Sequence, residues 1–195
     1  MTTDTDTVTA AEPDPTLSRR TIEGGEARVA TFTRTFATDP ADLWDACTNP
    51  ERLSRWYTRV SGDFRLGGTF EQELMGSATI VECEAPTFVR LSLGGGNDEI
   101  QVRISPGGAE GTSVLELQHA TTFDTHVIGG EMFDAIFCMG GGYYPRFAAL
   151  AAHLAGELPA DYDSTTFHMN PDMRPAIDRG LAAMQALLDA DAAAS

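Results

Sequence analysis

The spacing of hydrophobic and polar residues changes several times along this chain, and each change marks a predicted element. Residues 36–57 combine helical spacing with two start signals, Asp39-Pro40 and Asn49-Pro50, in which a capping side chain precedes a proline. The pattern predicts two short helices with apolar faces formed by Leu43, Trp44 and Cys47 in the first and by Leu53, Trp56 and Tyr57 in the second. Helices this short are unstable alone in water, so both must pack against a larger body.

Alternation with a period of two predicts that this body contains an antiparallel sheet. Residues 27–36 are rich in Val, Thr and Phe and form the first predicted strand. The later predicted strands are 69–74, 77–83, 87–93, 100–104 and 112–119. Short turns such as 94–97 and 106–108 join them, and connections this short link only antiparallel strands. One face of such a sheet can meet water, and the other must be covered.

Residues 132–155 are predicted to supply the cover, as a helical segment with apolar side chains on both sides of Gly140-Gly141-Gly142. Glycine costs about 1 kcal/mol per residue inside a helix, so a break or kink is expected at the triplet. Residues 158–170 are a predicted linker, and Asn170-Pro171 opens an extra C-terminal helix over 171–195. Its apolar stripe is Met173, Ile177, Leu181, Met184 and Leu188. A stripe of this size predicts docking on the domain, as a lid, or on a second copy, as a homodimer.

The N-terminal segment 1–24 is rich in Thr, Asp and Pro and lacks an apolar period. It is predicted to be a disordered arm, because it cannot bury enough apolar surface to offset chain entropy. The domain itself is therefore expected over residues 25–157.

The predicted order is a strand, two short helices, about six antiparallel strands and a long helix, which is the α+β layout of a helix-grip fold. Several local motifs stand in a specific order over about residues 28–156. They are residues 36–44, 48–53 with Trp56, 67–70, Gly76, Val81-Glu82 before Pro86, and Gly111-Thr112 before a strand ending at His119. In these motifs the chain resembles the SRPBCC (START-like) superfamily, and within it the bacterial homologues of the heat-shock protein 90 ATPase activator. The resemblance implies an apolar cavity between the sheet and the long helix, which in relatives binds lipids, polyketides or other hydrophobic molecules. Two segments depart from the family pattern: residues 120–139 are longer and more aromatic, and the helix after 170 lies outside the domain.

Composition narrows the set of partners. The formal net charge is −16 and the sequence pI about 4.4, which argues against nucleic acid and anionic membranes. The three cysteines lie far apart, so a reduced setting is expected. No apolar run reaches the roughly 18 residues of a membrane span, and no secretory signal pattern opens the sequence. A cytoplasmic protein is expected.

Aromatic and aliphatic residues of the sheet and the long helix are the ligand-site candidates. The predicted ligand-binding residues are Trp56, Tyr57, Phe70, Leu74, Leu117, His119, Phe133, Phe137, Tyr143, Tyr144 and Phe147. Ordinary packing of a helix on a sheet is the alternative for the aromatic residues of the long helix, and it is favoured. Trp44 is predicted to fill the core.

Candidate chemistry is sparse. His119 ends a strand on its apolar face and is a weak acid–base candidate, with a structural role as the favoured alternative. Asp124 and His126, near Glu131 and Asp134, are the other weak catalytic candidates, and such a set is more often a solvated loop face. No His or Cys pair has metal-ligand spacing, so neither a metal nor a cofactor is expected. An anion site where the glycine triplet meets the segment carrying Arg146 is disfavoured, because no strand or lysine accompanies it.

These observations lead to one main expectation of function. We expect the chain to bind a hydrophobic small molecule in an apolar cavity between the sheet and the long helix. One alternative is an enzyme of the cyclase, dehydratase or hydrolase type that uses His119 or Asp124 and His126. Another is a chaperone cofactor.

Overall fold

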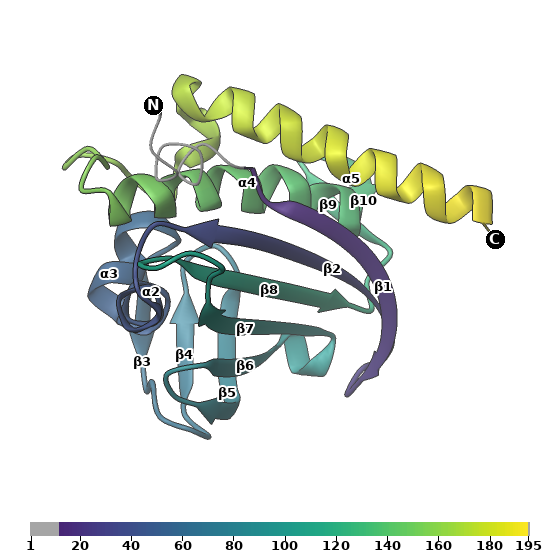
Figure 1. Cartoon of the computed structure of the whole chain (residues 1–195). Helices are drawn as coiled ribbons and strands as arrows, with labels where there is room; N and C mark the ends of the chain where they lie inside the picture. Colours follow the sequence, from purple (N-terminus) through teal and green to yellow (C-terminus); the bar gives the residue numbers. More distant parts are fainter. Residues whose placement is uncertain (1–11, 195) are drawn as a thin grey trace.

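A strongly curved antiparallel sheet wraps around the long helix α4, Ala135–Leu154, in the computed structural model, which describes residues 12–194 (Figure 1). Within this part of the chain the sheet has eight strands in the order β1-β2-β8-β7-β6-β5-β4-β3. Their bounds are Asp14–Ile22, Gly25–Phe36, Ser113–Thr121, Asp98–Pro106, Phe88–Leu93, Gly76–Glu84, Thr69–Gln72 and Val60–Gly62 in that spatial order. The predicted α+β helix-grip fold is confirmed.

Alternation along the central strands explains how the sheet meets the helix. On β2 the even-numbered residues from Ala30 to Phe36 are buried, and on β8 Leu115 and Leu117 are buried in the same core. Phe32 lies opposite Leu117 in the register of the two strands. Since successive side chains point to opposite faces, this register directs one mainly apolar row of each strand at α4. The exception on β2 is Arg34, which is buried and donates to the carbonyl of Phe147 at 3.0 Å.

The two predicted short helices are present as α2, Pro40–Thr48, and α3, Pro50–Trp56. The Asp39 carboxylate accepts hydrogen bonds from the N–H groups of Ala41 and Asp42, both at 2.9 Å, and Asn49 caps α3 in the same way. The burial of the two tryptophans differs from expectation. Trp44 is half-buried, whereas Trp56 is buried and its indole N–H donates to the carbonyl of Ala46 at 2.9 Å.

The prediction of a disordered arm over residues 1–24 is wrong for the part that the structure describes. Strand β1 pairs with β2 along its whole length, from Asp14 opposite Thr33 to Ile22 opposite Gly25. The pairing supplies hydrogen-bond partners for the backbone N–H and C=O groups of β1, and the amino-acid composition of the segment gives no sign of it. In addition, Leu17 packs against the main core. The sheet therefore begins before residue 25, while residues 1–11 lie outside the described residues.

The predicted break at the glycine triplet is also wrong, because α4 continues through Gly140-Gly141-Gly142. Gly140 lies against Gly180 of the C-terminal helix α5, Arg174–Ala194, and a Cβ on either glycine would overlap the carbonyl group of the other. Gly141 faces the side chain of Leu181 in the same contact. The triplet therefore lets two helix backbones approach closely, which offsets the low helix propensity of glycine.

A β-hairpin that the sequence analysis did not predict leads into α4. It consists of β9, Thr125–Ile128, and β10, Glu131–Asp134, so α4 begins at Ala135 and not at residue 132. Gly129 and Gly130 both have positive φ, as a two-residue hairpin turn of this kind requires. The sequence signal was the Gly-Gly pair that follows Val127-Ile128.

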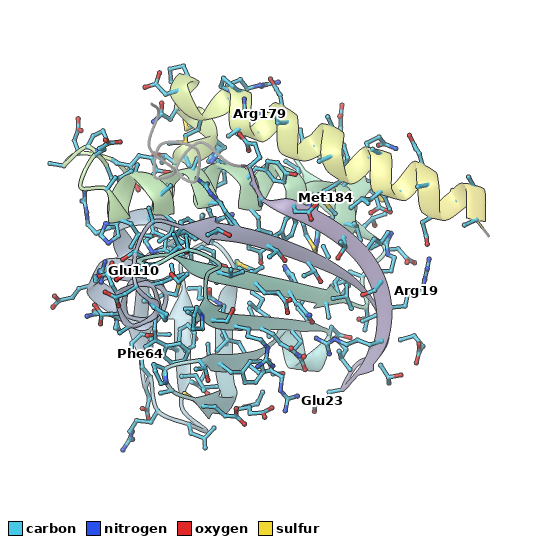
Figure 2. The ribbon with its side chains drawn as sticks, viewed as in Figure 1. Arg19, Glu23, Phe64, Glu110, Arg179 and Met184 are labelled. Carbon is cyan, nitrogen blue, oxygen red and sulfur yellow. The ribbon has the colours of Figure 1, made fainter. Side chains whose placement is uncertain are left out.

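Helix α5 docks on its own domain, which is one of the two arrangements predicted from its apolar stripe. It runs along α4 and crosses β1 (Figure 1), with Met184 fully buried on the side that faces the rest of the molecule (Figure 2). Ala176 and Gly180 are the other buried residues of this contact, and Ile177, Leu181 and Leu188 are half-buried. The predicted linker, residues 158–170, holds one 3-10 turn, Phe167–Met169. A second turn, Pro171–Met173, precedes α5, which begins at Arg174 and not at residue 171. A homodimer through α5 stays a prediction.

None of the helices in residues 12–194 is long and apolar enough to cross a membrane.

The contact between Gly140 and Gly180 makes a sharp stability prediction. Gly140→Ala is expected to lower the free energy of unfolding by about 1–3 kcal/mol, because the new methyl group forces α5 away from α4. Alanine is the better helix former by about 1 kcal/mol, so a loss has to come from the packing. Gly108→Ala is the matched control, since a Cβ there meets no atom within 4 Å. Urea unfolding of both variants measures the difference, and a Gly140→Ala protein as stable as the wild type would contradict this account of the triplet.

Candidate functional site

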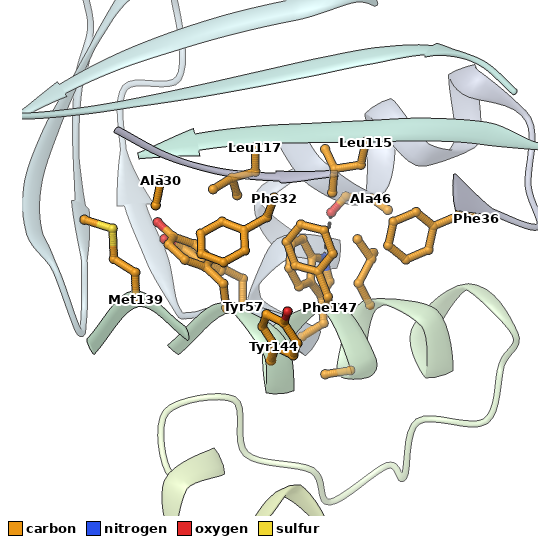
Figure 3. Close-up of a cluster of buried hydrophobic side chains, with 14 of the residues drawn as sticks. Ala30, Phe32, Phe36, Ala46, Tyr57, Leu115, Leu117, Met139, Tyr144 and Phe147 are labelled. Atoms are coloured by element: carbon orange, nitrogen blue, oxygen red, sulfur yellow. Dashed lines mark hydrogen bonds between the residues drawn. The ribbon is translucent and has the colours of Figure 1, made fainter. Parts of the chain in front are cut away.

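The space between the sheet and α4, where the ligand cavity was predicted, is occupied by side chains. Phe32 and Phe147 are fully buried there, and Phe32 lies 5.0 Å from the ring of Tyr143 (Figure 3). Tyr144 is also buried, and its hydroxyl donates to the carbonyl of Pro13 at 3.1 Å. Three predicted ligand-binding residues, Tyr143, Tyr144 and Phe147, are therefore part of the core. Packing on the sheet, the favoured alternative, explains them.

A small apolar cavity of about 50 Å³ remains beside this core, between the short helices and the strands. Four predicted ligand-binding residues line it, namely Trp56, Tyr57, Phe70 and Leu117. The rest of its wall is Cys47, Leu53, Gln72, Leu91, Ile100, Val102 and Leu115. Burial raises the pKa of the Cys47 thiol to about 12, so this wall is uncharged at neutral pH. Cavities that hold drug-sized ligands measure about 300–1,000 Å³, so this one accommodates a water molecule or two.

His119 takes part in a buried polar chain behind that cavity. Its Nδ1 lies 2.9 Å from the Tyr143 hydroxyl, and its Nε2 lies 3.4 Å from Oδ1 of Asp98. Burial disfavours the charged form of Asp98, but contacts with His119 and Thr121 outweigh that penalty and the pKa of this carboxyl is lowered. Burial raises the pKa of Tyr143 well above its usual value. His119 lines neither the small cavity nor the large one described below, and both of its ring nitrogens face side chains of the protein.

The second set of weak catalytic candidates does not converge on a point. Asp134 caps α4 by accepting from the N–H of Ile136 at 2.8 Å, and its other oxygen takes a 2.7 Å hydrogen bond from Arg28. His126 packs beside the ring of Phe123, and Asp124 is exposed. Across residues 12–194, no three His, Cys, Asp or Glu side chains gather as a metal site would require. The set forms the solvated hairpin face that was the favoured alternative.

A much larger apolar cavity, of about 510 Å³, lies on the other side of α4, beneath α5. It brings together three predicted ligand-binding residues, Leu74, Phe133 and Phe137, of which the two phenylalanines stack with ring centroids 6.2 Å apart. The remaining lining residues are Ile128, Cys138, Gly141, Gly142, Arg146, Phe167, His168, Ile177 and Leu181. Leu74 and Ile128 are 43% and 55% exposed, which places them at the mouth.

Arg146 is the one arginine or lysine in the wall of this cavity. Its guanidinium lies between two aromatic rings, 4.9 Å from the centroid of Tyr57 and 4.6 Å from that of Phe167. Two of its N–H groups donate to backbone carbonyls, from Nη1 to Gly142 at 2.9 Å and from Nε to Tyr57 at 3.4 Å. A Cβ on Gly142 would lie 3.1 Å from Nη1, so the third glycine of the triplet makes room for this side chain.

Several residues of this wall were not assigned to the site from the sequence. Ile177 and Leu181 were recognised only as part of a docking stripe, although the same stripe also closes the cavity. Arg146 was considered only for an anion bound at backbone amides. A stronger signal was available: among residues 135–154 it is the only Arg, Lys, Asp or Glu, in a helix that is otherwise mainly apolar.

Comparisons with known proteins agree with this architecture. The family model described as Activator of Hsp90 ATPase homolog 1-like protein matches residues 37–150. A search of curated proteins gives no match. Among solved structures, the crystal structure of CalU16 from Micromonospora echinospora is similar, with 28% identity, a TM-score of 0.71 and coverage of 90% of this chain and 97% of that chain. The solution structure of CalU16 gives 26% identity, a TM-score of 0.73, and coverage of 97% and 99%.

A more distant likeness extends the comparison to eukaryotes. The structure of an HSP90 activator from Plasmodium falciparum has 17% identity and a TM-score of 0.52, and the match covers 66% of this chain and 96% of that chain. At this identity the likeness concerns the fold alone. The family match covers more than half of the chain and includes α2, α3 and most of the sheet and α4. The chain therefore belongs to the family of Activator of Hsp90 ATPase homolog 1-like proteins.

Proposed function

We propose that this protein binds a hydrophobic small molecule in the large cavity between α4 and α5. The observation that carries the proposal is the cavity itself, with a volume of about 510 Å³ and a wall that is apolar except for Arg146 and His168. Its volume falls in the range of about 300–1,000 Å³ typical of small-molecule sites. Contact with its aromatic and branched side chains is worth roughly 0.8 kcal/mol for each ligand CH₂ group removed from water.

The large cavity lies at a different position from the ligand cavity that the family resemblance implies. The helix-grip cavity would lie between the sheet and α4, where Phe32, Tyr143 and Phe147 fill the space. The large cavity instead uses the outer side of α4 together with the two segments that depart from the family pattern, the hairpin before α4 and the helix after residue 170. The proposal is therefore specific to chains that carry both additions.

The alternative functions have less support. An enzyme that uses His119 would need that side chain at a cavity, and it lines neither of the two described above. A role as a chaperone cofactor rests on the description of the family and stays a prediction.

The first test introduces a charge into the cavity wall. Phe133→Asp is expected to weaken saturable binding of the neutral dye Nile red at least about tenfold, because the carboxylate hydrates the apolar wall. Phe123→Asp is the matched control, since Phe123 is 41% exposed and does not line the cavity. Fluorescence titration measures both affinities, after circular dichroism has shown that each variant is folded. Equal binding by Phe133→Asp and the wild type would place the dye elsewhere and contradict the proposal.

The second test uses the cysteines of the unaltered protein. Cys138 lines the large cavity, whereas Cys83 is exposed on the sheet. A bound ligand is expected to slow alkylation of Cys138 by iodoacetamide and to leave Cys83 unaffected. Burial raises the pKa of the Cys138 thiol, so labelling is best followed at about pH 8.5, where more of it is thiolate. Mass spectrometry of the peptides reads out both sites, and a ligand that binds without protecting Cys138 would argue against this cavity.

A further inference from the structure

We infer that the ligand of the large cavity is an apolar acid whose carboxylate pairs with Arg146. This inference rests on the proposed function and names the chemical class of the ligand. It depends on the position of the guanidinium, its lack of a counter-charge and its remaining hydrogen-bond donors.

Arg146 belongs to the deep part of the cavity wall. Only 8% of the surface of Arg146 is exposed to solvent, whereas Leu74 and Ile128 at the mouth are 43% and 55% exposed. The two aromatic rings of Tyr57 and Phe167 hold the guanidinium plane, and the carbonyl oxygen of Gly142 fixes one end of it. The group is thus oriented before any ligand arrives, which reduces the entropy lost on binding.

The charge of this guanidinium is not neutralised by the protein. Among residues 12–194, no carboxylate oxygen lies within 4.0 Å of its nitrogens, although the chain carries 29 acidic residues. Most exposed arginines have such a partner, as Arg19 has with Asp191 and Arg65 has with Asp63. A buried charge without an opposite charge is unfavourable for folding, so proteins retain one mainly where it serves a ligand or a reaction.

The donors that remain suit a carboxylate. Of the five N–H groups of arginine, one on Nε and one on Nη1 donate to backbone carbonyls, and none of the others has a hydrogen-bond acceptor in the described part of the chain. A guanidinium edge matches the two oxygens of a carboxylate, and such charge-assisted hydrogen bonds are stronger than neutral ones. The phenylalanine pair and the α5 side chains Ile177 and Leu181 then surround an apolar body attached to that carboxylate.

The acidic surface does not rule out an anionic ligand. Surface charges are screened over about 8 Å at physiological salt, whereas a contact made inside the cavity is screened much less. The direct pairing with Arg146 therefore dominates once the ligand has entered, and the net charge of −16 acts mainly on the rate of entry.

The experiment compares decanoic acid with decan-1-ol as competitors of Nile red, at about pH 7.5, where the acid is ionised. The wild type is expected to bind the acid at least about tenfold more tightly than the alcohol. Arg146→Met removes the charge and the hydrogen-bond donors but keeps an unbranched apolar stem, and it is expected to abolish the preference by weakening the binding of the acid. Arg174→Met is the control, because it removes the same charge from an exposed position on α5 that does not line the cavity.

The outcomes separate the inference from the function on which it rests. Equal affinity for acid and alcohol in the wild type, or a preference that survives Arg146→Met, overturns the inference and leaves hydrophobic binding in place. Failure of Nile red and both competitors to bind overturns both. The comparison on the wild type needs no variant, so it decides the question even where Arg146→Met does not fold.

Discussion

The close approach of α4 and α5 at Gly140 and Gly180 is the contact on which the rest of this structure depends. Neither backbone could lie where it does if either residue carried a Cβ. With α5 held there, α4 is covered on one side by the sheet and on the other by a second helix. A helix covered on both sides is apolar all round, and the sequence of α4 has this character apart from Arg146 and, in its last turn, His153.

This arrangement changes where a family member of this kind can hold a ligand. Large aromatic side chains fill the concave face of the sheet, so the fold gains packing energy there and retains little free volume. The hairpin before α4 and the helix after residue 170 build new walls on the other side, around a cavity about ten times larger. The glycine triplet serves both purposes, since Gly140 contacts α5 while Gly142 leaves space for the Arg146 guanidinium.

Local signals were sufficient to predict much of the fold. The caps at Asp39 and Asn49 act within three residues, and strand alternation follows burial, so the two short helices and the five strands over residues 69–121 were predicted. The three-residue strand β3, Val60–Gly62, was missed. The errors concern distant partners. Strand β1 depends on pairing with β2, and the meaning of the triplet depends on Gly180, forty residues away. For the site, helical spacing could not separate Tyr143 and Phe147, which face the sheet, from Phe137, which faces the large cavity, because α4 is buried on both sides. Phe133 was predicted in the same helix but lies on β10.

The most direct test of a ligand site between α4 and α5 is a methyl NMR titration with decanoic acid. The lining of the two cavities differs in its isoleucines and leucines, so their methyl groups report the place of binding. A ligand in the large cavity is expected to cause saturable shifts at Ile177, Leu181 and Leu74. Shifts centred on Leu91, Ile100 and Leu115, around the small cavity beside the sheet, would contradict binding in the large cavity.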